Sequence, residues 1–203
     1  MFQTILSVVM CVLLTLGTSS AKDVAARTLD NLQTAFSAES NAHERYLAFG
    51  KKADEEGYGK AASLFRAVAR SEEIHAQNQS NLIRKMEADP NVKSEAFRVN
   101  STKENLETAL RETTYGRDTM YPDFWSQARA DDDSDAMRTF TYAQFAETGS
   151  AKLFSAALGN LAKMRGKGDT YYVCSKCGYI TKEQHFDNCP SCRAALEGYE
   201  AVR

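Results

Sequence analysis

Apolar residues recur at three- and four-residue spacing along four long stretches of the chain, the pattern of helices that bury one face. Within the first stretch, Leu29, Leu32 and Phe36 fall on one side of a helix. Gly, Pro or acidic turns separate the stretches, and Pro122 predicts a kink inside the third. We expect helices over about 23–55, 60–88, 102–130 and 136–164. Four such helices, joined mainly by short loops, predict a mainly α, antiparallel four-helix bundle.

The N-terminus carries a different pattern. Residues Phe2 to Leu16 have no charge, and this run is shorter than the roughly 20 apolar residues that cross a membrane. Small residues with a cleavage-like Ser19-x-Ala21 follow it. We therefore expect residues 1–21 to be a signal peptide and the protein to be exported to the periplasm or the secretory pathway. No Lys or Arg precedes the apolar run, so a retained membrane anchor is the alternative.

The overall composition is that of an ordinary globular protein. Of the 203 residues, 43% are hydrophobic and 26% are charged, with a formal net charge of -2. A chain of this length can bury one sizeable core and carry a small appendage. The balanced charge argues against a nucleic-acid binder, because no basic excess is available to meet phosphates.

Four of the five cysteines form two tight pairs near the C-terminus, Cys174-x-x-Cys177 and Cys189-x-x-Cys192. Each pair places two thiolates on one side of a turn, and two facing turns make a tetrahedral sulfur cage suited to iron or zinc. Two disulfides are the alternative in an exported protein. Residues 165–170 predict a flexible linker, and 171–203 a small β-type module with too little apolar material to fold without its metal.

A second set of metal-ligand residue types lies on the predicted helices. Glu72 and His75 are three residues apart, so both lie on one helical face. Glu39 lies midway along the first helix among small residues, which would leave room for an ion. A di-iron carboxylate bundle uses one Glu from each of two helices and a Glu-x-x-His from each of the other two. These three residues would supply half of such a site.

Together these features resemble the rubrerythrin family, in which a ferritin-like di-iron bundle is joined to a rubredoxin-like iron domain. The resemblance spans nearly all of the chain after residue 21 and rests on Ala38–Ala42 with Tyr46, Glu72–His75, Met120–Pro122 and the cysteine pairs. It implies a ferritin-like bundle over 22–164 and a rubredoxin-like domain after it. It also implies peroxide reduction to water, with electrons from a redox donor protein passing through the rubredoxin-like iron. A homodimer is implied as well, with Tyr46 and Tyr121 near the bundle irons.

The chain departs from the family pattern on the third and fourth helices. Counting back from the Met-Tyr-Pro motif, the two glutamate positions of the third helix are Thr113 and Gly116. Glu112 lies one residue early, which rotates it by about 100° on a helix. On the fourth helix Glu147 remains, but its histidine partner is replaced by Ser150. A second iron would therefore lack the carboxylates that offset its charge.

The remaining ligands could still hold one divalent ion, with water completing its coordination. This residual bundle site consists of Glu39, Glu72, His75 and Glu147. His43, one helical turn from Glu39, is a candidate replacement ligand, although a His outside the ligand set is the commoner case.

Three functions follow from these patterns. The chain is a divergent peroxide reductase active in oxidative-stress protection, an electron carrier or metal-binding protein with a mononuclear or inactive bundle site, or a structural zinc protein without redox activity. Iron and zinc both accept four thiolates, so the cysteine motif leaves the metal open.

Overall fold

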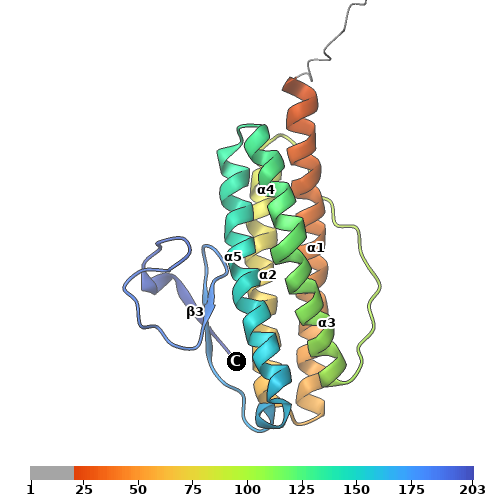
Figure 1. Cartoon of the computed structure of the whole chain (residues 1–203), viewed down its shortest axis with the longest axis vertical. Helices are drawn as coiled ribbons and strands as arrows, with labels where there is room; N and C mark the ends of the chain where they lie inside the picture. The colour runs from red at the N-terminus through yellow and green to blue at the C-terminus, as the bar shows by residue number, and fades with distance from the viewer. Residues whose placement is uncertain (1–20) are drawn as a thin grey trace, which may run out of the picture.

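The computed structural model describes residues 21–203, with side chains described from residue 26. The expected signal peptide lies outside this range, apart from Ala21. Figure 1 shows long helices packed side by side in a bundle, with the C-terminal module against one flank. The helices are α1 (Ala21–Glu55), α2 (Gly59–Lys85), α3 (Thr102–Tyr115), η1 (Gly116–Met120), α4 (Tyr121–Ala130), α5 (Ser134–Gly159) and η2 (Leu161–Met164). The predicted four-helix bundle is confirmed, with the third helix built from α3, η1 and α4.

The helices begin where the sequence provides capping side chains. Ser101 opens α3 with a capping box: its hydroxyl accepts the Glu104 N–H, and the Glu104 carboxylate accepts the Ser101 N–H. Asp133 caps α5 by accepting the Ala136 N–H at 2.9 Å. These caps satisfy backbone donors that helix starts leave unpaired.

The irregularity expected near Pro122 is a π-helical turn that lies just before it. Pro122 has no backbone N–H and stands at the start of α4. In the preceding turn, η1, the Tyr121 N–H donates to the Gly116 carbonyl, five residues earlier. The chain therefore continues as helix through this point but with a widened turn beside Gly116.

Two apolar clusters fill the bundle at different heights. One is built on an aromatic group with ring centroids 5.5–6.3 Å apart, formed by Tyr46, Phe49, Phe65 and Phe154. The other includes Leu32, Ile83, Tyr121 and Phe140. Along the helices, buried ionisable residues fall between the two clusters: Glu39, Glu72, His75 and Glu147. The bundle core thus contains a polar layer between two apolar ones.

The long connection from α2 to α3, residues 86–101, runs along the outside of the bundle (Figure 1). Asn41 of α1 donates from Nδ2 to the Lys93 carbonyl at 2.8 Å and accepts the Glu95 N–H at 3.0 Å. The Ser37 hydroxyl accepts the Lys93 N–H at 2.9 Å. These contacts fix the connection to the helix that carries Glu39.

The C-terminal module is a small antiparallel sheet of strand order β2-β1-β3. Its elements are β1 (Tyr171–Cys174), β2 (Ile180–Thr181), η3 (Leu196–Gly198) and β3 (Tyr199–Val202). Tyr171, Val173 and Ile180 join the apolar cluster of the bundle. Arg70 of α2 donates to both carboxylate oxygens of Glu200 in β3, at 2.8 Å each. The module is therefore packed on α2 through both apolar and ionic contacts.

The linker, residues 165–170, lies against the turn between α1 and α2. The Arg165 guanidinium stacks 4.1 Å from the ring centroid of Tyr58 and donates to its hydroxyl at 3.0 Å. A Cβ on Gly59 would collide with the Gly166 carbonyl oxygen, so this close approach requires glycine. The glycine-rich segment that the sequence indicates to be flexible is thus packed in place.

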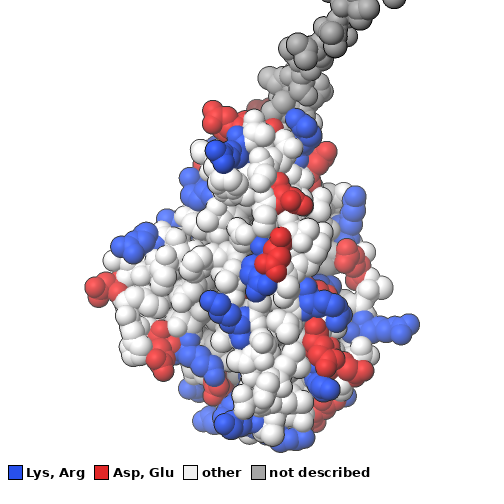
Figure 2. Space-filling model, in the orientation of Figure 1, with Lys and Arg blue, Asp and Glu red and all other residues white. Residues whose placement is uncertain are grey.

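Lys and Arg side chains are interspersed with Asp and Glu on the face shown in Figure 2. This mixture agrees with the small net charge of -2. Within residues 21–203, no helix combines the length and apolar character that crossing a membrane requires.

Candidate metal centres

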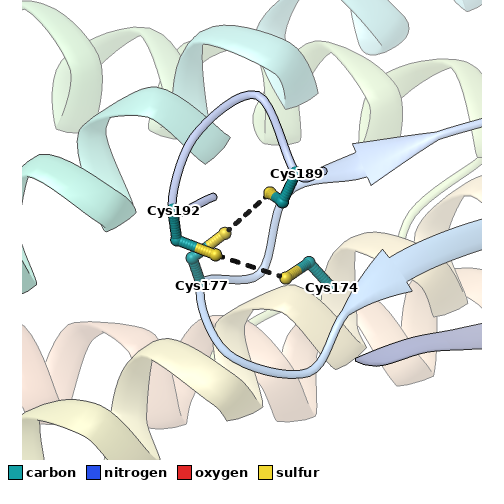
Figure 3. Close-up of side chains that lie close together, drawn as sticks. All are labelled: Cys174, Cys177, Cys189 and Cys192. Carbon is teal, nitrogen blue, oxygen red and sulfur yellow. Dashed lines mark hydrogen bonds between the residues drawn. The ribbon is translucent and has the colours of Figure 1, made fainter. Parts of the chain in front are cut away.

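The paired cysteines meet at one end of the small sheet, with their sulfurs pointing toward one another (Figure 3). They come from the end of β1, the turn after it and the loop before η3: Cys174, Cys177, Cys189 and Cys192. The Gly178 N–H donates to the carbonyl of the first cysteine at 2.8 Å, and the Arg193 N–H to that of the third at 2.9 Å. Gly178 and Arg193 have φ of 74° and 60°, which lets the chain turn back after each pair. The two pairs are therefore built alike.

The sulfur positions fit a tetrahedral metal site. All four Sγ atoms lie within 4.8 Å of one another, with 3.7 Å between Cys174 and Cys192 and 3.5 Å between Cys177 and Cys189. Thiolates bound at about 2.3 Å from one ion stand about 3.8 Å apart, whereas a disulfide requires about 2.05 Å. The four cysteines are free thiols. The geometry therefore fits iron or zinc and not a pair of disulfides.

The close packing of the four thiols gives them different pKa values. Hydrogen bonding with Cys177 lowers the pKa of Cys174 to about 5, whereas burial raises the pKa of Cys192 to about 11. One thiolate is thus stabilised by its neighbours, but four thiolates repel one another unless a cation lies between them. A bound metal ion supplies that charge balance.

A second group of metal-ligand atoms lies in the polar layer of the bundle. Glu39 of α1 and Glu72 and His75 of α2 each offer one ligand atom within 4.8 Å of the others. His75 Nδ1 is 3.0 Å from Glu72 Oε2 and 3.6 Å from Glu39 Oε1. All three side chains are buried, with 2% of each residue exposed. Two carboxylates and an imidazole at these separations suit one divalent ion.

His75 also connects the bundle to the cysteine cage. Its Nε2 lies 3.2 Å from the carbonyl oxygen of Cys177. A carbonyl can only accept, so Nε2 carries a proton, and Nδ1 faces the two carboxylates, where it donates when the ring is protonated and can bind an ion when that proton leaves. A hydrogen bond from the far nitrogen is the usual way of orienting a ligating histidine.

Two neighbours of His75 on α2 hold the same turn of the module. The Ser71 hydroxyl donates to the Gly178 carbonyl at 2.7 Å, and Asn78 Nδ2 donates to the Lys176 carbonyl at 2.9 Å. Three successive carbonyls are thus bound by one helical face. Sequence reasoning missed these two polar residues, although their spacing of four and three from His75 is a signal that could have found them.

Comparisons with known proteins show which family the chain belongs to. The rubrerythrin family model matches residues 30–158. The chain is 34% identical over 181 residues to rubrerythrin-2 of Clostridium acetobutylicum, covering 87% of this chain and 97% of that protein. The chain belongs to the rubrerythrin family. Nigerythrin of Nitratidesulfovibrio vulgaris is 34% identical over 177 residues, covering 86% of each chain.

Solved structures agree with this rubrerythrin fold. Nigerythrin in its fully reduced, all-ferrous state superposes with a TM-score of 0.79 at 34% identity, covering 86% of each chain. A bacterioferritin of Desulfovibrio desulfuricans, with a TM-score of 0.67 at 19% identity, covers 82% of this chain and 99% of its own and shares the ferritin-like fold. Family membership and the two groups of ligand atoms support a rubrerythrin-like iron protein.

The second helix pair of the bundle does not offer the ligands of a second iron. Thr113 and Ser150 are buried, each 1% exposed, but the Thr113 hydroxyl donates to the Ala109 carbonyl at 2.9 Å. A Cβ on Gly116 would lie 2.8 Å from Glu147 Oε1, so Glu147 fills the space beside the glycine. The residues present fit one ion in the bundle and do not fit two.

The low-dielectric polar layer favours protonated groups. Burial, with the charge of Glu39, raises the pKa of Glu72 to about 8, and burial raises that of Glu147 well above its usual range. Burial alone would lower the pKa of His75, but hydrogen bonds with Glu39 and Glu72 raise it to about 10. Among residues 26–203, nothing pairs with Glu147 Oε2. A cation would favour the ionised carboxylates over their protonated forms.

Two buried tyrosines hold carboxylates beside the polar layer. The Tyr121 hydroxyl donates to Glu39 Oε1, and the Tyr46 hydroxyl donates to Glu112 Oε2 at 3.2 Å. Arg45 Nε also donates to Glu112 Oε2, at 3.1 Å. Burial raises the pKa of both phenols, so each keeps the proton that it donates. Glu112 thus reaches Tyr46 from a backbone position one residue before the family's ligand.

His43, considered as a replacement ligand, lies elsewhere. Its Nδ1 is 2.8 Å from the Ala69 carbonyl oxygen, and its Nε2 is 3.9 Å from Glu44 Oε1. The described ligand group of the bundle contains His75 and not His43.

Proposed function

We propose that this member of the rubrerythrin family is a non-haem iron oxidoreductase that reduces hydrogen peroxide and so protects against oxidative stress. The O–O bond breaks, and two electrons and two protons are taken up, so that each peroxide yields two water molecules. A separate reduced redox protein supplies the electrons. Iron held by four thiolates provides one-electron chemistry when bound.

One contact carries this proposal. His75 faces Glu39 and Glu72 through Nδ1 and meets the Cys177 carbonyl at 3.2 Å through Nε2. A single imidazole therefore touches both candidate metal centres. A cage that only stabilised the module would not require this connection to the polar layer of the bundle.

The protein side chains have distinct tasks in this proposal. Glu39, Glu72 and His75 would hold one ion, and the Tyr121 hydroxyl keeps Glu39 oriented by donating to its Oε1. Glu147 offers a buried oxygen that has no partner within residues 26–203 and can exchange a proton with a bound molecule. Apolar clusters border the layer at both ends, which lowers the local dielectric and strengthens these polar interactions.

A second candidate function is an electron carrier whose bundle site is mononuclear or inactive. Thr113, Gly116 and Ser150 stand where the family has iron ligands, and this observation favours that candidate. Both candidates include export across a membrane, which the N-terminal sequence indicates, and a homodimer, which the resemblance to the family implies.

Metal analysis and the visible spectrum of the untagged protein test the proposal. We expect about two irons per chain, one in the cage and one in the bundle, with the absorption of ferric thiolates. Anaerobically reduced protein should be reoxidised by hydrogen peroxide. His75→Gln should lose the bundle iron and slow reoxidation by about tenfold or more, because the ligand and the contact to Cys177 are both removed.

His185→Gln is the matched control, because His185 is exposed and pairs only with Glu183 among the described residues. It should keep both the iron content and the rate of the parent. Equal reoxidation rates in His75→Gln and the parent would overturn the proposal in favour of an electron carrier. A colourless protein containing zinc alone would overturn both redox candidates.

A further inference from the structure

A cavity of about 360 Å³ leads from the surface into the polar layer of the bundle. Its rim carries exposed residues, including Tyr115 with 58% of its surface exposed, and its inner end is formed by Glu39 and Glu147. Ala38, Ala42 and Met120 contribute apolar wall between rim and inner end. The cavity therefore joins solvent to the candidate ligands of the bundle.

Gly116 lies beside Glu147 at the inner end of this cavity. It lines the cavity at η1, and a Cβ there would lie 2.8 Å from Glu147 Oε1 and 3.1 Å from its carboxyl carbon. Any side chain at this position would displace the Glu147 carboxylate from the inner end of the cavity. The glycine at an expected iron-ligand position therefore lets Glu147 take the place in which it lines the cavity.

Glu147 supplies an independent indication of a ligand. Glu147 is only 7% exposed, and its Oε2 has no hydrogen-bond partner in the part of the chain with described side chains. Buried carboxyl oxygens are nearly always hydrogen-bonded, and an unpaired one carries a desolvation penalty. A hydroxyl donor from a molecule in the cavity would remove that penalty.

The size of the cavity exceeds what hydrogen peroxide needs. It is about ten times the roughly 30 Å³ that a water molecule occupies in the liquid. It falls within the range of about 300–1,000 Å³ that is typical of sites for small organic molecules. The space therefore suits a molecule with a hydrocarbon group attached to its reacting end.

The charges of the cavity favour a neutral ligand. Arg45 is paired with Glu112 at 3.1 Å, and the other cation of the lining, Arg111, shares the rim with Glu95. The inner end carries Glu39 and Glu147 and no cation, so it offers no charge to balance a carboxylate or a phosphate. A neutral molecule with an O–H donor at one end meets both conditions.

We propose that this cavity binds small organic hydroperoxides, with the hydrocarbon group against the apolar wall and the O–O–H group at Glu39 and Glu147. This inference rests on the proposed function, whose substrate range it extends. The O–O bond of ROOH breaks, and two electrons and two protons give ROH and one water. The electrons come from the same reduced redox donor protein, and Glu147 Oε2 accepts the hydroperoxide O–H when the substrate binds.

Binding can be measured apart from turnover with 2-phenyl-2-propanol, the stable alcohol product of cumene hydroperoxide. Ligand-observed NMR on the full chain as purified should show binding to the parent. Gly116→Ala should weaken it by about tenfold, the effect expected when a methyl-sized change alters a hydrophobic site, and Ala38→Leu, which adds three carbon atoms, by at least as much. Gly149→Ala is the matched control, because a Cβ there meets nothing within 4 Å and lies outside the cavity.

Turnover gives the second measurement. The ratio of cumene hydroperoxide to hydrogen peroxide reduction should fall in Gly116→Ala and Ala38→Leu and stay at the parent value in Gly149→Ala. Hydrogen peroxide reduction without alcohol binding in the parent would overturn this inference and leave the proposed function standing. Alcohol binding that is equally strong in all four proteins would also overturn it. Alcohol binding that weakens as expected, with neither peroxide reduced, would overturn the proposed function and its hydroperoxide extension together.

Discussion

Glu39, Glu72 and His75 share one small buried volume in which two carboxyl groups face a single imidazole nitrogen. Such a group is stable only when protons or a cation offset the negative charges. The raised pKa values of Glu72 and His75, about 8 and about 10, mean that protons do so at neutral pH. An ion that enters this site must therefore compete with them.

We predict that metal binding to the bundle releases protons. Near pH 7, below both pKa values, about two protons should leave as one ion binds, and between about 8 and about 10 only about one should leave. The apparent affinity should consequently rise with pH and level off above about 10. Calorimetry in two buffers of different ionisation enthalpy, on protein with its cysteine site filled, measures the number released.

The sign of the stability change provides the check on this prediction. The contribution of His75 is full below its unfolded pKa of about 6.5 and is lost as pH rises through about 10. Glu72, raised from 4.5 to about 8, also makes the folded state bind more protons than the unfolded state. In protein without bundle metal, the free energy of unfolding should therefore fall as pH rises toward about 10. The fall should be smaller in Glu72→Gln, which lacks one of the two titrating groups. Binding without proton release would contradict the assignment.

Part of this residue-scale picture can be predicted from sequence. The spacing of Glu72 and His75 places them on one face, and the structure brings Glu39 to the same point. The contact between Glu112 and Tyr46 could not be predicted from sequence. It forms because the Glu112 side chain is long enough to reach around α3, and because Arg45 also donates to its carboxylate. Helical periodicity fixes the direction of a Cα–Cβ bond but not the position of a terminal oxygen.

Helix α2 binds the cysteine module through one face. Ser71, His75 and Asn78 contact three successive backbone carbonyls of the first cysteine turn. These hydrogen bonds hold the turn so close to α2 that little room is left for a side chain at Gly178. A Cβ on Gly178 would lie 2.5 Å from His75 Nε2 and 2.7 Å from Ser71 Oγ. The fit between helix and turn thus depends on a glycine that also has a φ of 74°.

We predict that Gly178→Ala separates the turn from α2 without emptying the cage. The left-handed conformation should cost about 1–2 kcal/mol in an alanine, and the collision with His75 adds to it. The variant should keep its ferric thiolate absorption, lose thermal stability and be reoxidised by peroxide more slowly.

Gly198→Ala is the control for this change, because a Cβ there would first meet Ser175 Oγ at an ordinary 3.5 Å. It should match the parent in spectrum, stability and rate. If Gly178→Ala also matched the parent, the contact between His75 and Cys177 would not be needed for the reaction.

At the scale of elements, the sequence predicts the helices better than their irregular parts. The caps at Ser101 and Asp133 and the break at Gly57 follow local residue preferences. The π turn does not, because periodicity over a whole helix averages out one inserted residue, and Pro122 indicates only that some irregularity occurs.

The whole molecule consists of two modules that share one apolar cluster. Tyr171 and Val173 of the sheet pack with the aromatic group of the bundle, and the linker is fixed by the stacking of Arg165 on Tyr58. Composition predicted a flexible linker because glycine usually indicates freedom. Here Gly59 and Gly166 instead allow two backbones to touch, which only the folded arrangement reveals.

Because of this arrangement, we expect removal of the cage metal to disorder the cysteine module more than the bundle. The bundle has two apolar clusters of its own, whereas the cysteine turns share a separate small cluster built on the buried Cys174, Cys177 and Cys189. Four thiols without an ion lose the cross-link that holds the two turns together, and a module of this size has little else to replace it.

We predict that removing the cage metal with a chelator leaves the helical circular dichroism nearly unchanged. Backbone amides of 182–195 should lose hydrogen-exchange protection, while Tyr171–Val173, packed on the bundle, should keep a larger share of theirs. Glu72→Gln, which weakens only the bundle site, should leave exchange in 182–195 at the parent level. Loss of helical signal together with the cage would mean that the shared cluster joins bundle and module into one cooperative unit, since protection would then disappear throughout at once.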